Sequence, residues 1–335
     1  MGNDEPLLGE LLVHTIDCNE ISISSDRDSI SIKIIGVSSF ILFCKSFRDD
    51  VLRAKRLLES IAVFNQDHIP FYLSVPSADL NLFHATIDFK ALNEKNRGAF
   101  YCITDEEVVA AMPNSTLTDY QQMRGYCSQQ VVKSEAWRLL GCEHYLCLDS
   151  DAFFTQNFYL SYFLHPDGNP YSLMHDAHEL LDLAKTMGKN EVIESFLKDS
   201  RQLKQEFSRE GPDYDFGPPP MIWSAKVWDS LYTQHLEPKS ERFWDAIERI
   251  PLEIRWYGEA LLKFKAIPIH PITPLFVFYH YEWQYQFAKQ QGNAIPTNEK
   301  ILGVVMQSYW DESLRPTFAR KGFLSRTWKR IKQSL

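Results

Sequence analysis

The sequence predicts an α/β fold with a mostly parallel central sheet that is flanked by helices. Two apolar runs, SFILFC from Ser38 and IPFYLSV before Pro76, stand on either side of a segment from Val51 to Phe64 with helical apolar spacing. A strand, a helix and a second strand in this order imply a parallel βαβ unit. A later run, HYLCL, leads into Asp149 and is continuously apolar, which is typical of a strand buried on both faces.

Further elements of the first half follow from local patterns. Residues 11–35 alternate between apolar and polar on both sides of a polar stretch, which predicts a β-hairpin before the main domain. The run AFYCITD predicts another strand, and this strand ends at Asp105. Ser128 is a favourable N-cap for a helix over 128–140, and Gly141 is a favourable stop.

The second half predicts a charged helical insertion and an irregular loop. Residues 176–208 have helical character and many charges, so we expect them outside the main sheet. The segment GPDYDFGPPP that follows is too rich in glycine and proline for regular structure. Helices over 244–250 and 257–264 and a late strand over 275–281 complete the pattern.

Composition bounds the class of protein. The chain has 335 residues, of which 44% are hydrophobic and 24% charged, as in an ordinary globular protein. A formal net charge of -9 argues against a nucleic-acid partner, because binding of that kind needs a basic footprint. The six cysteines include no CxxC pair, and the N-terminus MGNDEPLLGE resembles no signal peptide, so we expect a reducing cytoplasm. We also expect no transmembrane helix.

The tripeptide D-x-D occurs three times, and only one copy follows a predicted strand. Asp26 and Asp28 fall in the predicted hairpin turn, where Asp is favoured for local backbone reasons. Asp213 and Asp215 fall in the irregular loop, although such a loop can still touch a substrate. The copy at 149–151 ends the buried strand, and ligands of open α/β sheets bind at the carboxyl ends of strands.

Asp149 and Asp151 therefore predict a metal site. Side chains two apart on extended backbone point the same way, and no Lys or Arg is adjacent in the sequence. Two such carboxylates repel one another unless a cation joins them, and hard oxygen ligands suit Mg²⁺ or Mn²⁺ bound to a substrate phosphate. The alternative is a pair of solvated acids at a strand end.

With its apolar strand, D-S-D and apolar pair, the stretch HYLCLDSDAFF resembles the metal-binding motif of GT-A-fold nucleotide-sugar glycosyltransferases, and more specifically of bacterial glycosyltransferase-like proteins. The resemblance covers roughly residues 38–285. It implies a GT-A-like (Rossmann-like) catalytic domain over 38–285, with a nucleotide-sugar half at 38–155 and an acceptor half at 156–285. Residues 1–37 would then form an N-terminal extension, and residues 286–335 a C-terminal one.

The resemblance also implies a reaction. A sugar would move from a nucleotide diphosphate sugar, with a UDP-sugar favoured, to a saccharide or lipid-linked glycan acceptor. Asp149 and Asp151 would hold Mn²⁺ or Mg²⁺ against the diphosphate, and Asp149 can also contact the ribose. Such enzymes often add a late histidine as a metal ligand. His280 is our candidate and His270 the rival, while a structural role is as good an interpretation of either.

Donor, acceptor and catalytic candidates follow from strand ends and loops. Each has a plain structural alternative, such as a solvated helix face or core packing. A carboxylate near the acceptor hydroxyl would act as general base in an inverting transfer, with Glu259 first, as the acid that opens a helix after Gly258, and Asp215 or Asp176 as alternatives. For the acceptor we expect Trp223 and Ser224. For the donor we expect Lys45, Ser46, Phe47, Asp105, Arg124, Gln129, Gln130 and Lys133.

The end of the chain predicts a basic amphipathic helix over 319–335, because apolar residues at helical spacing alternate with cations. A helix of this kind binds anionic membrane surfaces peripherally, as an enzyme of cell-envelope polysaccharide biosynthesis on the cytoplasmic face would need. The alternative is a solubilising tail. Two other functions are alternatives to the glycosyltransferase: a haloacid-dehalogenase-like phosphohydrolase that uses Asp149 and Asp151, and a non-catalytic carbohydrate-binding or scaffold protein.

Overall fold

The computed structural model describes residues 38–95, 99–176, 178–295, 298 and 300–317, and the predicted hairpin and basic tail lie outside these residues. The described part contains a five-stranded sheet in the order β3-β2-β1-β4-β7. Its strands are β1 (Phe40–Lys45), β2 (Phe71–Val75), β3 (Phe100–Thr104), β4 (His144–Asp149) and β7 (Met221–Ser224). The first four run parallel and β7 runs antiparallel to β4, so the predicted α/β fold with a mostly parallel sheet is confirmed.

Helices cover both faces of this sheet because its strands are apolar on both faces. Along β1, Leu42 and Cys44 face one core, while Ile41 and Phe43 face the other. The first core is covered by α1 (Val51–Phe64), α2 (Leu80–Thr86) and α3 (Phe89–Lys95). The second is covered by α4 (Asp105–Ala110), α6 (Gly125–Leu140), α9 (Ala225–Leu231), α10 (Phe243–Arg249) and α11 (Glu253–Phe264).

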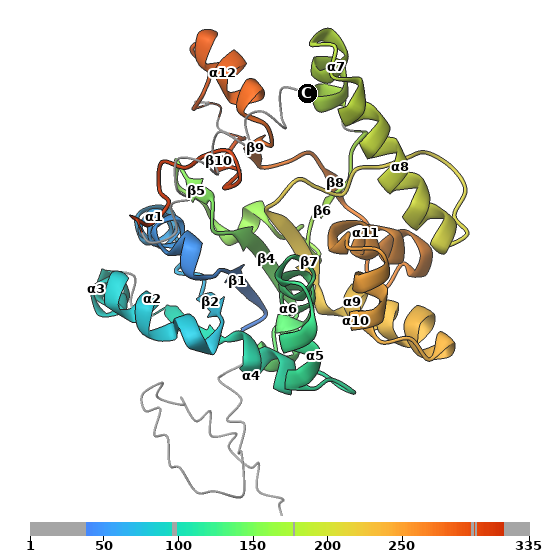
Figure 1. Ribbon diagram of the computed structural model, residues 1–335, viewed down its shortest axis with the longest axis horizontal. Coiled ribbons are helices and arrows are strands. Elements are labelled where there is room, and N and C mark those ends of the chain that lie inside the picture. The colour runs from blue at the N-terminus through green and yellow to red at the C-terminus, as the bar shows by residue number, and fades with distance from the viewer. Residues whose placement is uncertain (1–37, 96–98, 177, 296–297, 299, 318–335) are drawn as a thin grey trace, which may run out of the picture. The chain divides into compact units, whose positions relative to one another are not determined.

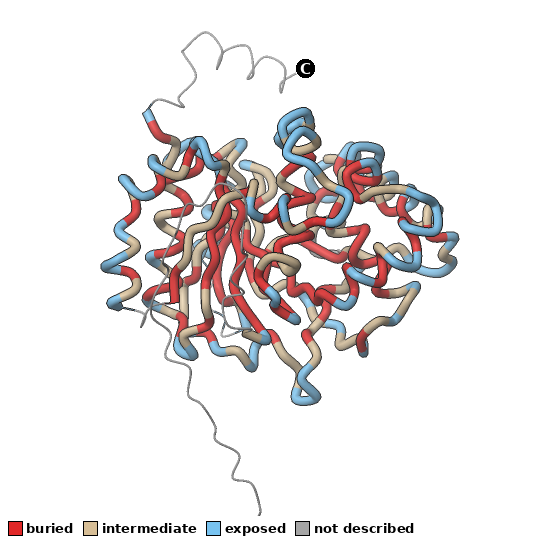
Figure 2. Tube along the Cα trace, turned by 90° about the horizontal axis from the view of Figure 1, so that it is seen from below, coloured by how far each residue is buried: buried red, intermediate tan, exposed pale blue. Residues whose placement is uncertain are grey.

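The pictures show the same layers. In Figure 1 the central strands stand between α1–α3 on one side and α9–α11 on the other. Figure 2 shows the strands as a buried layer and the outer turns of the helices as exposed. The short helix α5 (Leu117–Gln122) lies between α4 and α6 in the chain. In the part of the chain that the structure describes, none of the helices is both long and apolar enough to cross a membrane.

Two smaller sheets extend the fold beyond the D-x-D strand. In the first, β10 (Gly303–Met306) lies between β5 (Ala152–Phe154) and β9 (Phe276–Tyr279), antiparallel to β5 and parallel to β9. The second pairs β6 (Ser172–Leu173) with β8 (Pro271–Ile272). Part of the segment assigned to a C-terminal extension, which also contains most of α12 (Glu282–Gln290), therefore shares a sheet with the strand that follows Asp151.

The helical insertion is confirmed as α7 (His178–Thr186) and α8 (Asn190–Glu206), and some predicted helix boundaries are corrected. Helix α6 begins at Gly125 with Arg124 at its N-cap, three residues before the predicted start at Ser128. It ends as predicted at Gly141, whose φ of 61° suits glycine. Helix α11 begins at Glu253, so the prediction that Glu259 opens this helix is wrong.

Gly258 lies inside α11 because another side chain occupies the space of a Cβ atom. A Cβ built there would lie 2.1 Å from Cγ of Phe216, far inside van der Waals contact. A glycine lowers helix stability by about 1 kcal/mol relative to alanine, so the close packing of the Phe216 ring explains its presence. This contact fixes the loop before β7 against α11.

We predict that Gly258→Ala lowers the free energy of unfolding by about 1–3 kcal/mol, because overpacking outweighs the gain in helix propensity. Gly125→Ala is the matched control, since a Cβ there meets nothing within 4 Å. It should leave stability unchanged or slightly raised. Urea denaturation of both variants measures the difference, and equal effects would contradict the packing argument.

Candidate functional site

The carboxyl ends of β1 and β4 form the switch point of the central sheet. Along the chain, β2 and β3 are added on one side of β1 and β4 on the other. The helical connections therefore diverge at this point, and open α/β sheets bind ligands there. Lys45 ends β1 directly beside Asp149, which ends β4. Both line a cavity of about 1640 Å³, together with Asp151, Asp215 and His280.

Asp149 is paired with a buried lysine from the preceding helix. Lys133 Nζ lies 2.5 Å from Asp149 Oδ1 and 3.7 Å from Glu253 Oε1. Burial disfavours the charged ammonium, but the two carboxylates overcome this and raise the pKa of Lys133. No Lys or Arg adjoins the D-x-D acids in the sequence, and the structure brings a cation to Asp149 from α6, sixteen residues earlier.

Asp151 is the more unusual of the two acids. Its side chain is buried, and Oδ2 accepts a hydrogen bond from the backbone N–H of Ser308 at 2.9 Å. Oδ1 is also buried and has no hydrogen-bond partner among the described residues. Burial first and the charge of Asp149 second raise the pKa of Asp151 to about 7. A buried carboxylate oxygen without a donor is costly unless a ligand completes it.

This donor set fits a divalent cation. Asp149 and the unpartnered Oδ1 of Asp151 are hard oxygen ligands, and two carboxylates with substrate phosphate form a common Mg²⁺ site. Asp50, which is not among the predicted site residues, also lines the cavity and ion-pairs with Arg53 at 2.6 Å. Its position in KSFRDD, just after a buried strand, was the available signal.

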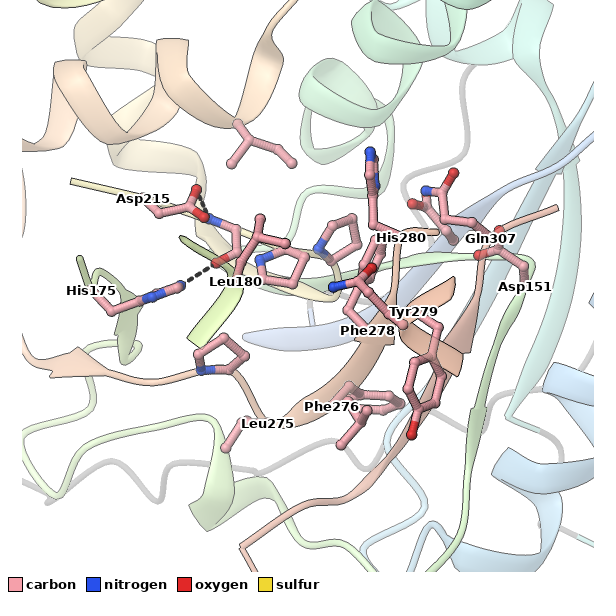
Figure 3. Close-up of a pocket in the computed structure, with 18 of the residues that line it drawn as sticks. Asp151, His175, Leu180, Asp215, Leu275, Phe276, Phe278, Tyr279, His280 and Gln307 are labelled. Atoms are coloured by element: carbon pink, nitrogen blue, oxygen red, sulfur yellow. Dashed lines mark hydrogen bonds between the residues drawn. The ribbon is translucent and has the colours of Figure 1, made fainter. Parts of the chain in front are cut away.

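His280 lines the cavity but is not gathered with these acids. Within the described residues, no group within 4.8 Å unites a nitrogen of His280 with oxygens of Asp149 and Asp151. Figure 3 shows His280 between Asp215 on one side and Asp151 on the other. Burial lowers the pKa of His280, and the acid that opposes this effect is Asp215. The prediction of His280 as a third metal ligand is therefore not supported by the geometry.

Five donor candidates line the cavity, and three do not. Those that do are Lys45, Phe47, Gln129, Gln130 and Lys133. Lys45 also forms an ion pair with a buried acid, because its Nζ lies 2.9 Å from Asp105 Oδ2.

The structure does not place Asp105 at the cavity as a ligand contact; its carboxylate is bonded inside the protein instead. It is fully buried outside the cavity lining, where it accepts hydrogen bonds from Ser74 Oγ and Tyr120 OH, both at 2.6 Å. Ser46 is buried beside it, with its N–H donating to the carbonyl of Ser74. Arg124 lies outside the lining at the start of α6, where Nη2 donates to Cys127 Sγ at 3.6 Å.

Among the acceptor and catalytic candidates, some are buried in the core and others line the cavity. Trp223 is buried against Tyr145, Trp228 and Tyr257, and Ser224 is wholly buried, so neither reaches the cavity. These two residues are core, because β7, the edge strand next to β4, is buried along its whole length and contributes side chains to both cores.

Glu259 is likewise held away from the cavity. It is buried and accepts two hydrogen bonds from Arg209, at 2.5 and 2.9 Å. Asp215 does line the cavity: its backbone pairs with His175, and its Oδ1 accepts from Gly217 N–H at 3.3 Å. Asp176, the further alternative, lines the cavity as well.

The sequence did not single out Glu253, Asp199 or most of the aromatic side chains that line the cavity. Glu253, the first residue of α11, lines the cavity, and its N–H donates to Gln130 Oε1 at 3.1 Å. Burial raises the pKa of Glu253. Apart from Phe47, the aromatic side chains of the lining come from helices, strands and loops distant in sequence; they are Tyr126, Tyr162, Tyr171, Phe196, Phe276, Phe278, Tyr279, Tyr281, Phe287 and Tyr309.

Comparison with known protein families places this chain. A family of unknown function (DUF6492) matches residues 32–258, which is more than half of the chain. The chain belongs to this family. The matched part contains Lys45, Lys133, Asp149, Asp151 and Glu253, and it ends before β9 and β10. A comparison with curated proteins found no match.

The raised pKa of Asp151 predicts a pH-dependent stability in the absence of metal. The unfolded chain releases this proton near pH 3.9, whereas the folded chain holds it up to about pH 7. The stability contributed by protonated Asp151 is therefore present below the unfolded value and is lost as pH rises through about 7. Asp151→Asn keeps an acceptor for Ser308 and removes the titration.

We expect the free energy of unfolding of Asp151→Asn, relative to that of the natural chain, to be higher at pH 8 than at pH 5. The gain should not exceed a few kcal/mol, since one pKa unit corresponds to about 1.4 kcal/mol. Urea denaturation with a chelator present measures it, and Asp182→Asn, an exposed change on α7, is the control. An equal difference at both pH values would refute the assignment.

Proposed function

We propose that this protein is a metal-dependent glycosyltransferase that uses a nucleotide diphosphate sugar, with a UDP-sugar favoured, and a saccharide or lipid-linked glycan acceptor. One observation carries the proposal: Asp149 and Asp151 stand at the switch point of a mostly parallel sheet, in a large cavity, with Asp151 Oδ1 buried and unpartnered. Carboxylates so placed suit a cation that holds a diphosphate. The finer assignment of the fold as GT-A-like is part of the same proposal.

On the donor side, Asp149 and Asp151 would hold Mn²⁺ or Mg²⁺. The bound cation supplies stabilisation of the negative charge that develops on the departing nucleoside diphosphate. The chain positions its two ligands separately. Lys133 holds Asp149, while Arg56 Nη2 donates to the carbonyl of Asp151 at 3.0 Å and Ser308 N–H donates to its carboxylate. Lys45, at the neighbouring strand end, adds positive charge for phosphate.

On the acceptor side, Asp215 is the general base in our proposal. An acceptor hydroxyl would give its proton to Asp215 while its oxygen attacks the anomeric carbon, and the bond from that carbon to the diphosphate oxygen breaks. Asp215 and Asp151 lie on opposite sides of the pocket in Figure 3, and the cavity that both line, of about 1640 Å³, is large enough for a sugar. The aromatic lining, including Tyr126 and Tyr281, offers flat apolar faces with hydroxyl groups at their edges.

The predicted attachment to anionic membranes through 319–335 stays a prediction that suits a lipid-linked acceptor on the cytoplasmic face. Co-sedimentation with anionic vesicles, before and after deletion of these residues, examines it without reference to the catalytic proposal.

We predict that UDP together with Mn²⁺ raises the melting temperature and that EDTA removes the increase. At a ligand concentration about 100 times Kd the stabilisation is about 2.7 kcal/mol. Asp149→Asn and Asp151→Asn should lose it. Asp213→Asn is the matched control, because it changes another D-x-D acid, one that pairs with Lys204 at 2.6 Å outside the cavity lining.

No stabilisation by any nucleoside diphosphate would overturn the glycosyltransferase proposal. Phosphatase activity on p-nitrophenyl phosphate that Asp149→Asn abolishes would replace it with the phosphohydrolase. A screen of sugar nucleotides for release of nucleoside diphosphate then identifies the donor.

With an active donor in hand, we expect Asp215→Asn to lower kcat by about 10²–10⁴, as for loss of a general base. Glu259→Gln should leave kcat nearly unchanged and instead lower the free energy of unfolding by about 1–3 kcal/mol, because the partly buried guanidinium of Arg209 loses its charged partner. Steady-state kinetics and urea denaturation of both variants separate these effects. Unchanged kcat in Asp215→Asn would remove this residue from the mechanism.

A further inference from the structure

A second cluster of metal-ligating side chains lies apart from Asp149 and Asp151. His165, Asp167 and His270 place their ligand atoms within 4.8 Å of one another. Among the described residues, this is the one group of three or more His, Cys, Asp or Glu side chains that meets this distance. Asp167 Oδ1 lies 3.1 Å from His165 Nδ1, and its Oδ2 lies 2.8 Å from His270 Nε2. The two imidazole rings are stacked with centroids 3.6 Å apart. None of the three residues lines the large cavity.

The backbone holds these three side chains in place before any ligand binds. His165 and Asp167 belong to a tight turn, in which His165 N–H donates to the carbonyl of Asn169 and Gly168 adopts φ 84°. Asn169 N–H donates to Asp167 Oδ1 at 2.9 Å. The carboxylate is therefore held with one oxygen near each ring.

His270 reaches the turn from a distant part of the sequence. It stands immediately before β8, and its carbonyl accepts from Ser172 N–H at 2.8 Å. Pro268 and Pro271 flank Ile269 and His270, and fixed φ angles limit the movement of this segment. The cluster thus joins the turn at 165–169 to the start of β8, two segments that are about a hundred residues apart.

We propose that His165, Asp167 and His270 bind a Zn²⁺ ion that clips the turn at 165–169 to β8. Two imidazoles and one carboxylate are the ligand set of three-ligand zinc sites, in which water is the fourth ligand. Imidazole favours zinc over the Mg²⁺ or Mn²⁺ expected at Asp149 and Asp151. The ion would take the place of any hydrogen on the imidazole nitrogens that face the carboxylate of Asp167. All three residues are partly exposed, so metal and water can enter.

The clip has a consequence for the cavity wall. Tyr171 packs edge-on against both His165 and His270 and also lines the cavity. The adjoining sheet of β6 and β8 has only the pairs Ser172 with Pro271 and Leu173 with Ile272. A sheet this short is weakly held by its own ladder, so a bound ion would stabilise the wall that contains Tyr171, Ile272 and Thr273.

Zinc binding to the full chain without a polyhistidine tag tests this proposal. After treatment with a chelator, isothermal titration with Zn²⁺ should give one tight site. Each of His165→Ala, His270→Ala and Asp167→Asn should weaken it at least tenfold, because changes even outside the ligand shell weaken metal sites about 10–100-fold. His84→Ala, an exposed histidine on α2, is the matched control and should bind normally.

Two further measurements keep the result unambiguous. Asp151→Asn should retain the zinc site, which separates it from the donor-metal site and from the proposed function. Co²⁺ in place of Zn²⁺ should give the intense visible absorption of tetrahedral cobalt, lost in His270→Ala while the far-ultraviolet circular dichroism is retained. Absence of a zinc site in the natural chain, or a site that survives in all three variants, would overturn the proposal.

Discussion

Lys133 brings a positive charge into the interior between two acids, and the arrangement of the site depends on it. Its ammonium lies between Asp149 at the end of β4 and Glu253 at the start of α11. Removing ions from water is expensive, and a buried charge left without its partner is strongly destabilising. The three side chains are therefore stable only together, which fixes α6, β4 and α11 relative to one another. The acids and Lys133 all line the cavity, so the same contact that orients these elements also sets the charge of the site.

A second set of contacts ties Asp151 to the last part of the described chain. Ser308, just after β10, donates to its carboxylate, and Arg56 from α1 donates to its carbonyl. Arg56 also lies over the ring of Phe153, at 4.2 Å. Strand β10 would otherwise expose an edge, and its pairing with β5 places Ser308 at this position. The family match ends at residue 258, so the residues that complete the pocket around Asp151 come in part from outside the matched region.

The copies of D-x-D that the structure describes differ in the partners of their acids. In the loop copy Asp213 is neutralised by Lys204, whereas Asp215 faces the cavity. In the strand copy Asp149 is paired with Lys133, whereas Asp151 keeps a buried oxygen without a donor. The second acid of each copy therefore lines the same cavity. In the sequence, the two copies differ in the element that precedes them, a strand or a loop. The sequence does not show that both copies reach one cavity, because the loop is positioned by the long-range pairing of His175 with Asp215.

The sequence by itself determined β1, α1, β2, β3 and the end of α6 between Ser38 and Gly141, and the position of Asp149 and Asp151 at a strand end. These features depend on apolar periodicity and on local backbone preferences, which are written in short segments. Only the tertiary structure decided which polar residues face the cavity. Glu259 and Trp223 were plausible by local pattern, yet α11 begins at Glu253 and β7 is buried although it is an edge strand. Glu253 and other aromatic side chains line the cavity instead. The partner of a charged side chain is set by long-range packing, and Lys133, Arg209 and Ser308 each find theirs in distant segments that no local pattern connects.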